Sequence, residues 1–294
     1  MSDSIHYPSI SVVIPSFNQG QYIEETILSI LGQQYPNLEI IVIDGGSTDN
    51  TVEILEQYSD QISYWHSKKD KGQADAINQG MNLSSGEVLC WLNSDDMYLP
   101  GTLLDIGQRF RGRTDKSHFI YGSALTIKQI DGVFGGGSQN AAPFEAMTLT
   151  HSYFLVQPST FWTRQLWQCT GELNLSYNYV LDWDWFIRAS KVTEFEYVQR
   201  FYSVYRYHPL HKTSTGGVER RKEIIEIVTK YSSSYWINLY REVDKCYSQI
   251  KKTKKILDSL RMPKRQLLLP KLFPNIKNIL INEQDFYSIL GIYE

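Results

Sequence analysis

The sequence has few cysteines and no long apolar run. Its three cysteines, Cys90, Cys169 and Cys246, are scattered and odd in number, so they offer neither a disulfide framework nor a CxxC metal site. A membrane-spanning helix needs about 20 consecutive apolar residues, and no stretch approaches that length. The first residues, MSDSIHYPS, lack the basic and apolar regions of a secretory signal. We therefore expect a cytoplasmic protein.

Basic charge is also scarce in the main body of the chain. Residues 219–294 hold 15 Lys and Arg against 9 Asp and Glu, whereas residues 1–218 hold 14 against 23. An acidic body argues against a nucleic-acid-binding protein. The basic excess is concentrated in residues 245–277, which hold ten cations and one acid interleaved with apolar residues. This segment predicts peripheral contact with an anionic membrane surface, and the alternative is a solvated helical appendage.

Apolar runs and helical patterns alternate along the first half of the chain. Residues 10–14, 38–43 and 88–92 are continuous apolar runs typical of strands buried on both faces, and helical spacing fills the intervals between them. Strands separated by helices indicate parallel crossovers. We therefore expect an α/β, Rossmann-type, mostly parallel sheet flanked by helices in residues 1–216, with a C-terminal helical, basic extension in residues 217–294.

One segment of the chain is rich in glycine. Residues 133–140 read VFGGGSQN, with three consecutive glycines. Glycine is depleted in strands and frees the backbone. We expect a loop here.

Polar side chains follow three of the predicted strands, at Pro15–Asn18, Asp44–Asp49 and Asn93–Asp96. Because the carboxyl ends of parallel strands meet at one edge of a sheet, these clusters should converge there. Asp95 and Asp96 are the sharpest feature, since adjacent acids repel each other and a hard cation such as Mg²⁺ or Mn²⁺ would compensate. The alternative is a solvated turn in which Asp96 caps the next helix.

Other well-known site motifs are absent from the sequence. It contains no GxGxxG dinucleotide motif, no GxxxxGK[ST] phosphate loop, no GxSxG elbow and no HExxH zinc motif. The glycines and acids must therefore belong to another kind of site.

Taken in order, the polar clusters resemble the nucleotide-sugar domain of family 2 glycosyltransferases, which have the GT-A fold. The resemblance covers about residues 9–213 and rests on the following segments: Pro15–Asn18, Asp44–Asp49, Lys71–Gln73, Asn78–Gly80, Asn93–Asp96, Gln157–Phe161, Leu181–Asp184 and Arg206–His208. It implies inverting transfer of a sugar from a nucleotide-diphosphate donor, usually with Mn²⁺ or Mg²⁺. The acceptor would be a hydroxyl of a glycan or a lipid-linked glycan, in polysaccharide or other glycan biosynthesis.

The resemblance assigns donor-side residues position by position. Asn93–Asp95 occupies the place of the family's DxD motif, so Asp95 is the expected metal ligand. The further residues expected to contact the donor are Pro15, Asn18, Asp44, Asp75 and Asp96. Gly45 stands where the family has a second acid, so recognition of the base by a carboxylate there is absent.

The resemblance also assigns residues to the acceptor side and to the metal. Asp182 matches the catalytic base, and Asp184 is the alternative base or a partner of Arg188. His208 is a second candidate metal ligand, with His211 as the alternative.

Two other functions compete with glycosyl transfer. A sugar nucleotidyltransferase would carry a basic, glycine-rich loop after the first strand, and PSFNQGQYI has no basic residue. A catalytically silent nucleotide-sugar binding module would not need both Asp95 and Asp182. We therefore expect an active glycosyltransferase.

Overall fold

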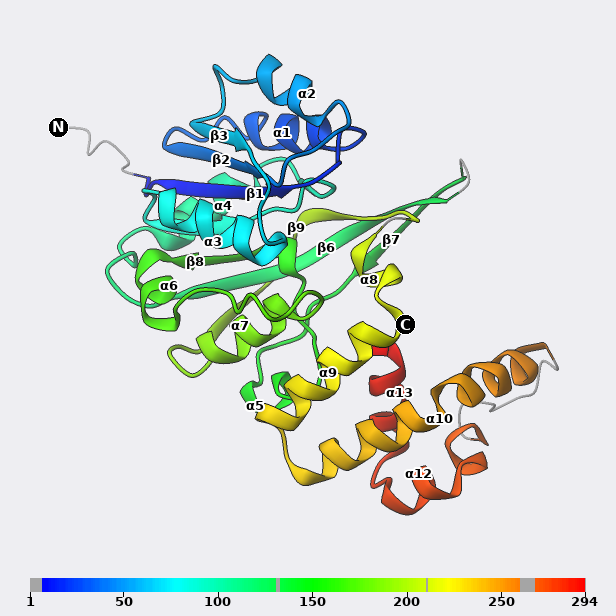
Figure 1. Cartoon of the computed structure of the whole chain (residues 1–294). Helices are drawn as coiled ribbons and strands as arrows, with labels where there is room; N and C mark the ends of the chain where they lie inside the picture. Colours follow the sequence, from blue (N-terminus) through cyan, green and yellow to red (C-terminus); the bar gives the residue numbers. More distant parts are fainter. Residues whose placement is uncertain (1–6, 131–132, 210, 260–267, 294) are drawn as a thin grey trace. The chain divides into compact units, whose positions relative to one another are not determined.

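The computed structural model describes residues 7–130, 133–209, 211–259 and 268–293 (Figure 1). The chain packs as two compact units. One comprises the chain up to Phe144 together with Phe154–His211, and the other comprises Glu145–Tyr153 together with the chain from Lys212. The division into domains 1–216 and 217–294 stays a prediction.

The first unit is built on a mixed sheet. In the described part of the chain its nine strands run in the order β3-β2-β1-β4-β8-β6-β9-β5, with β7 paired to β6. Their bounds are β1 Ile10–Ser16, β2 Leu38–Asp44, β3 Tyr64–Ser67, β4 Val88–Trp91, β5 Met97–Tyr98, β6 Phe119–Ile130, β7 Val133–Gln139, β8 Thr160–Thr163 and β9 Phe195–Tyr207. The first four strands pair in parallel, as do β6 and β9, whereas β8, β7 and β5 join their neighbours antiparallel.

Helices cover both sides of this sheet (Figure 1). They are α1 Ile23–Leu31, α2 Thr51–Gln57, α3 Gln73–Leu83, α4 Thr102–Phe110, α6 Arg164–Thr170 and α7 Leu181–Ala189, with a short 3₁₀ turn at Gln157–Ser159. Every residue of β1 is buried, as expected for a strand covered on both faces. Helix α3 lies so close to β1 that a Cβ on Gly80 would come within 2.4 Å of Val13. The predicted α/β fold is confirmed.

The expectation of a loop over residues 133–140 is wrong. Val133–Gln139 forms β7, which pairs antiparallel with β6 in a register that runs from Ala124↔Gln139 to Ile130↔Val133. Backbone hydrogen bonds need no side chains, so a long neighbouring strand can hold even a glycine-rich segment extended.

The second unit is helical. Its elements are α5 Ala146–Leu149, α8 Lys212–Thr215, α9 Gly217–Tyr231, α10 Ser234–Ser259, α12 Pro274–Ile279 and α13 Glu283–Tyr293, with a 3₁₀ turn at Pro270–Leu272. Apolar residues such as Ile227, Val243 and Ile289 are fully buried between them. The predicted helical C-terminal extension is confirmed. No helix in the described ranges combines the length and the apolar character that crossing a membrane requires.

Candidate functional site

Three loops meet at one edge of the sheet, because β1, β2 and β4 are parallel neighbours. Ser16 at the end of β1 lies beside Asp44 at the end of β2, which in turn lies beside Ser67 of β3. On the other side of β1, Val13 pairs with Trp91, the last residue of β4. The polar clusters that follow these strands therefore begin at the same edge.

Asp44 organises the loop that follows β2. Its carboxylate is fully buried and accepts hydrogen bonds from the backbone N–H groups of Gly46 (3.1 Å) and Ser47 (2.8 Å). The hydroxyls of Ser47 and Ser67 donate to the same carboxylate, each at 2.6 Å. Four donors satisfy a buried charge that would otherwise be costly. In this structure Asp44 therefore shapes the loop, and its direct contact with a donor stays a prediction.

Asn18 joins the loop after β1 to the loop after β2. It has a φ of 52°, in the left-handed region that Asn tolerates better than most residues. Its side-chain oxygen accepts the backbone N–H of Thr48 at 2.8 Å, and its own backbone N–H donates to the hydroxyl of Ser47 at 2.7 Å. Pro15 is buried in β1, whereas Phe17 is 59% exposed. The two loops thus form one hydrogen-bonded ledge that presents an aromatic ring to solvent.

A further acid lies beside this ledge, and the sequence reasoning missed it. A Cβ on Gly45 would lie 3.0 Å from Asp70 Oδ2, so the Asp70 carboxylate fills the space next to the position where the family has its second acid. Burial raises the pKa of Asp70, and the charges of Asp75 and Asp44 raise it further. Asp75 lies in the first turn of α3 and accepts the backbone N–H of Lys71 at 3.0 Å.

Asp95 forms a pair with His208, a residue 113 positions away in the sequence. Nε2 of His208 lies 3.0 Å from Oδ2 of Asp95, and the two side chains are 2% and 15% exposed. The ring of Tyr22 packs against the imidazole with 4.6 Å between the ring centroids. Nδ1 of His208 is buried and has no hydrogen-bond partner among the residues that the structure describes. The geometry unites two residues that were predicted separately as metal ligands.

Asp96, the next residue in the chain, is more deeply buried than Asp95. It is 1% exposed and accepts the backbone N–H of Arg206 at 3.0 Å and the side-chain amide of Asn93 at 3.3 Å. Burial, followed by the negative charge of Asp95, raises its pKa well above the ordinary value. Asp96 does not cap the next helix, because α4 begins at Thr102 after Gly101. Its predicted contact with the donor ribose remains untested.

Arg206 and Asn93 fix this loop in place. The guanidinium of Arg206 donates from Nε to the backbone oxygen of Asp95 at 3.0 Å, pairs with Glu25 and lies 4.9 Å above the ring of Tyr22. Asn93, at the first position of the DxD motif, accepts from Nε2 of Gln73 at 2.8 Å. Asn93 also donates to Oε1 of Gln157 at 3.1 Å, and Gln157 donates to the backbone oxygen of Trp91 at 3.0 Å. Asn93 thus belongs to a network of hydrogen-bonded side-chain amides that holds the loop carrying Asp95 in place.

The Asp95–His208 pair offers one oxygen and one nitrogen to a cation. Within the described residues no group of three or more His, Cys, Asp or Glu side chains is placed to hold a metal ion. Mg²⁺ is commonly bound by only one or two carboxylates, with substrate phosphates among its other ligands. The two residues therefore fit a divalent cation whose coordination is completed by a substrate diphosphate. Of the two side chains, Asp95 retains some exposure to solvent, whereas His208 is almost fully buried.

The two acids of α7 differ in their surroundings. Asp182 is half-buried in the first turn, and its Oδ1 accepts the backbone N–H of Trp183 at 2.8 Å. Asp184 is 1% exposed and pairs with Arg188 at 2.9 Å. Of the two, Asp182 has the more accessible carboxylate. Trp183 and Trp185 are both buried, so neither is open to stack on a sugar in this structure.

The predicted site residues fall into groups. Asp95, Asp96 and His208 are joined directly or through Arg206, and Asn18 and Asp44 belong to the ledge. His211 is also buried and donates its backbone N–H to the backbone oxygen of His208 at 3.0 Å.

Comparison with known proteins gives matches over part of the chain. Residues 11–121 match the family model described as glycosyl transferase family 2. An uncharacterized glycosyltransferase of Rickettsia felis is 35% identical over 128 residues, which are 43% of this chain and 21% of the relative. A PGL/p-HBAD biosynthesis glycosyltransferase of Mycobacterium tuberculosis is 29% identical over 186 residues, which are 62% of this chain and 70% of the relative. The chain spans only 17% to 32% of the length of the Rickettsia relatives.

Solved structures of similar fold cover nearly the whole chain. S. aureus TarS 1–349 in complex with UDP-GlcNAc has a TM-score of 0.58 at 16% identity, over 97% of this chain and 91% of that one. The mannosyltransferase PcManGT from Pyrobaculum calidifontis, in complex with GDP-Man and Mn²⁺, has a TM-score of 0.61 at 12% identity, over 98% and 88%. At these identities the likeness shows the fold alone.

Proposed function

Because residues 11–121 match the model of glycosyl transferase family 2 and the fold is similar to that of GT-A glycosyltransferases, we propose that the protein is an inverting, metal-dependent glycosyltransferase. It would transfer a sugar from a nucleotide-diphosphate donor to a hydroxyl acceptor. The observation that carries the proposal is the Asp95–His208 pair at the carboxyl edge of the parallel strands. Ligands of open α/β sheets bind at this edge.

The donor would lie on the ledge formed by the loops after β1 and β2. We expect the nucleoside to lie near Asn18, Asp44, Asp70 and Phe17, while Asp95 and His208 would hold Mn²⁺ or Mg²⁺ beside the diphosphate. Such a cation would stabilise the negative charge that develops on the leaving diphosphate. The neighbours TarS and PcManGT, which are complexed with UDP-GlcNAc and with GDP-Man and Mn²⁺, support this class of donor.

Asp182 would act as the general base. An aspartate with an ordinary pKa of about 3.9 is ionised at neutral pH and can accept a proton as the acceptor hydroxyl attacks the anomeric carbon. Asp184 is less suited to this role, because Arg188 neutralises it and it is almost inaccessible. The more exposed of the two acids, Asp182, is therefore also the one that the resemblance assigns as the base.

The acceptor side of the proposal concerns glycans and membranes. We propose that the protein works in the cytoplasm. It would help to build a polysaccharide or another glycan, and its acceptor would be a glycan or a lipid-linked molecule. Peripheral contact with an anionic membrane would involve residues 245–277, in which Lys251, Lys252 and Lys255 are exposed on α10. Residues 260–267 of this basic segment lie outside the described part of the chain.

A thermal-shift screen tests the proposed function. The full chain is melted with UDP, GDP, dTDP and CMP, each with and without Mn²⁺. A ligand that binds the native state raises the melting temperature by mass action, so one nucleoside diphosphate should stabilise the protein and do so more strongly with Mn²⁺. Stabilisation by none of them would contradict the proposal. Slow hydrolysis of the matching nucleotide sugar then separates an active enzyme from a silent binding module.

A further inference from the structure

Tyr22, at the start of helix α1, packs against the Asp95–His208 pair. It is 7% exposed, and its ring centroid lies 4.6 Å from that of His208, with 43° between the two ring planes. The guanidinium of Arg206 lies 4.9 Å from the centroid of the same tyrosine ring. Arg206 and His208 are two residues apart at the end of β9, a spacing that puts the side chains of an extended chain on one side. One aromatic ring therefore packs against both side chains.

The imidazole of His208 is hydrogen-bonded to the protein at one nitrogen only. A histidine that binds a metal ion through one ring nitrogen usually donates its other N–H to a carboxylate, a carbonyl or water, which fixes the orientation of the ring. In His208, Nε2 lies 3.0 Å from Oδ2 of Asp95, whereas Nδ1 is buried and has no hydrogen-bond partner in the described part of the chain. Packing by neighbouring rings must therefore restrain the imidazole. The ring of Tyr22 is closer to it than the ring of His211, whose centroid lies 5.9 Å away.

Helix α1 also holds the loop that carries Asp95. Oγ1 of Thr26, one helical turn after Tyr22, donates to the backbone oxygens on either side of Asp95, those of Ser94 at 3.0 Å and of Asp96 at 2.7 Å. Thr26 is fully buried. The first turn of α1 therefore contacts the Asp95 loop by hydrogen bonds and the imidazole by ring packing.

We propose that Tyr22 is a positioning residue of the proposed metal site. Its ring holds the imidazole of His208 against Asp95, so that the two side chains can bind one cation. This inference rests on the proposed function, in which the pair binds the cation of the donor diphosphate. Because the contact is made by the ring, phenylalanine should replace Tyr22 without loss, whereas leucine or methionine fills space without offering a flat ring.

A double-mutant cycle between Tyr22 and His208 in the full chain tests the proposal. UDP, and GDP in a parallel series, is titrated by calorimetry with Mn²⁺ and with a chelator, and the ratio of the two affinities is the gain due to Mn²⁺. The proteins are the wild type, Tyr22→Leu, Tyr22→Phe, His208→Gln and the double variant Tyr22→Leu/His208→Gln. Tyr22→Met is a second variant without a ring, used if leucine impairs folding. Thermal melting without ligand checks that each protein is folded.

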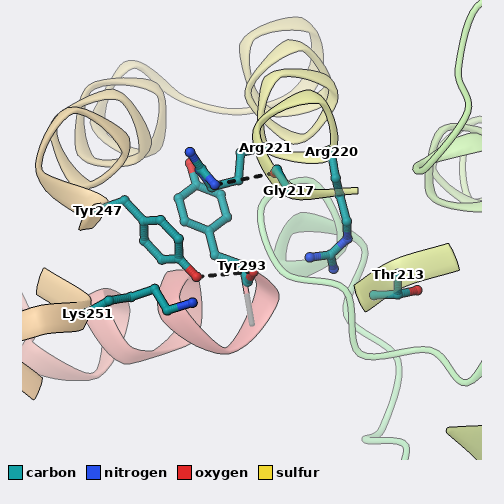
Figure 2. A pocket seen from close by; sticks show the side chains of 7 residues that line it. All are labelled: Thr213, Gly217, Arg220, Arg221, Tyr247, Lys251 and Tyr293. Carbon is teal, nitrogen blue, oxygen red and sulfur yellow. Dashed lines mark hydrogen bonds between the residues drawn. The ribbon is translucent and has the colours of Figure 1, made fainter. Parts of the chain in front are cut away.

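Tyr247→Leu is the matched control. Tyr247 is 6% exposed, and the guanidinium of Arg221 lies 4.5 Å from its ring centroid, so it resembles Tyr22 in burial and in its contact with an arginine. It lines a pocket of the helical unit that includes neither Asp95 nor His208 (Figure 2). The control therefore removes a buried ring and a contact between a ring and a guanidinium, and leaves the metal pair intact.

We expect the gain due to Mn²⁺ to fall by about 10-fold or more in Tyr22→Leu, as is usual when a metal ligand loses the group that orients it. In Tyr22→Phe and Tyr247→Leu the gain should stay within about 2-fold of the wild-type value. In the double variant it should equal the gain of His208→Gln, because a positioning residue has no effect once the residue that it positions is gone.

The inference is overturned if Tyr22→Leu keeps the gain, or if its loss adds to the loss caused by His208→Gln. It is also overturned if Tyr22→Phe or Tyr247→Leu loses as much of the gain as Tyr22→Leu does. In all of these cases the wild type still shows the gain, so the proposed function stands. A wild type without any gain due to Mn²⁺ would overturn the proposed metal dependence and this inference together.

Discussion

At the scale of single residues, neighbouring acids in this chain differ in how deeply they are buried. Asp95 is accessible and faces His208, whereas Asp96 beside it is buried under Arg206. The order of the motifs predicts that Asp95 is a metal ligand. The resemblance named His208 as a second candidate metal ligand, and the structure brings it to Asp95 although the two lie 113 positions apart in the sequence. Asp70 was missed since a lone acid in a polar loop has no distinguishing pattern in the sequence.

The paired acids of α7 give a residue-scale prediction. Asp182→Asn removes the proposed base, so turnover should fall by about 10²-fold or more while donor affinity persists. Asp184→Asn should instead lower the free energy of unfolding by about 1–3 kcal/mol, because Arg188 loses its charged partner. Steady-state kinetics with a matched donor and acceptor, together with urea unfolding of both variants, measures these effects.

The control in this comparison is the stability of Asp182→Asn, which should stay near that of the wild type. Wild-type turnover in Asp182→Asn would remove the base assignment. A loss of turnover in Asp184→Asn without a loss of stability would transfer the role to that residue.

At the scale of helices and strands, the sequence was most informative where apolar runs are continuous. The predicted strands 10–14, 38–43 and 88–92 correspond to β1, β2 and β4, and the helical spacing predicted between them corresponds to α1, α2 and α3. The pairing of β6 with β8 and β9 was beyond prediction, because it joins distant segments whose partners are set by tertiary packing. The glycine-rich strand β7 was missed because glycine is depleted in strands, whereas its backbone hydrogen bonds to β6 hold it extended.

Helix α4 is anchored to β9 by Asp105. The Asp105 carboxylate accepts from Nε of Arg109 at 2.7 Å and from the hydroxyl of Tyr202 at 2.6 Å, and it pairs with Arg200. Burial raises the pKa of Asp105, but the hydrogen bonds and the two arginine charges outweigh it and lower the pKa overall. A group whose pKa is lower in the folded state stabilises the fold above its unfolded pKa, here about 3.9, and loses this effect as pH falls.

This arrangement predicts a pH-dependent loss in Asp105→Asn. The variant should unfold about 1–3 kcal/mol more easily than the wild type at pH 7. The difference should shrink below about pH 4, as the wild-type carboxylate becomes protonated. Urea unfolding at a series of pH values measures the difference. A gap that stays constant down to acid pH would show that the charge of Asp105 does not stabilise the fold.

At the scale of the whole molecule, the two units have opposite charge. The acidic main body carries the proposed donor site, and the basic residues are concentrated in the helical C-terminal part. The composition alone predicted this difference and the helices.

Membrane contact is tested on the full chain by removing three positive charges from α10. The triple variant Lys252→Gln/Lys254→Gln/Lys255→Gln should sediment less with phosphatidylglycerol vesicles, because each cation near an anionic surface contributes about 1 kcal/mol. Sedimentation with pure phosphatidylcholine is the control, and neither protein should bind there. Equal sedimentation of the wild type and the triple variant with anionic vesicles would leave α10 as a solvated helix.

The central claim is that Asp95, paired with His208, binds the nucleotide donor through a divalent cation. The most direct measurement is calorimetric titration of the nucleotide selected by the thermal-shift screen, with Mn²⁺ and with a chelator. The proteins are the wild type, Asp95→Asn and Asp115→Asn, whose exposed side chain lies in the loop between α4 and β6. Asparagine at position 95 keeps an oxygen for His208 but removes the charge.

In the wild type and in Asp115→Asn, Mn²⁺ should strengthen binding of the nucleotide. In Asp95→Asn this gain should fall by at least about 10-fold, while the weaker binding measured with chelator stays unchanged. If Asp95→Asn binds the nucleotide with Mn²⁺ as tightly as the wild type does, the central claim is contradicted.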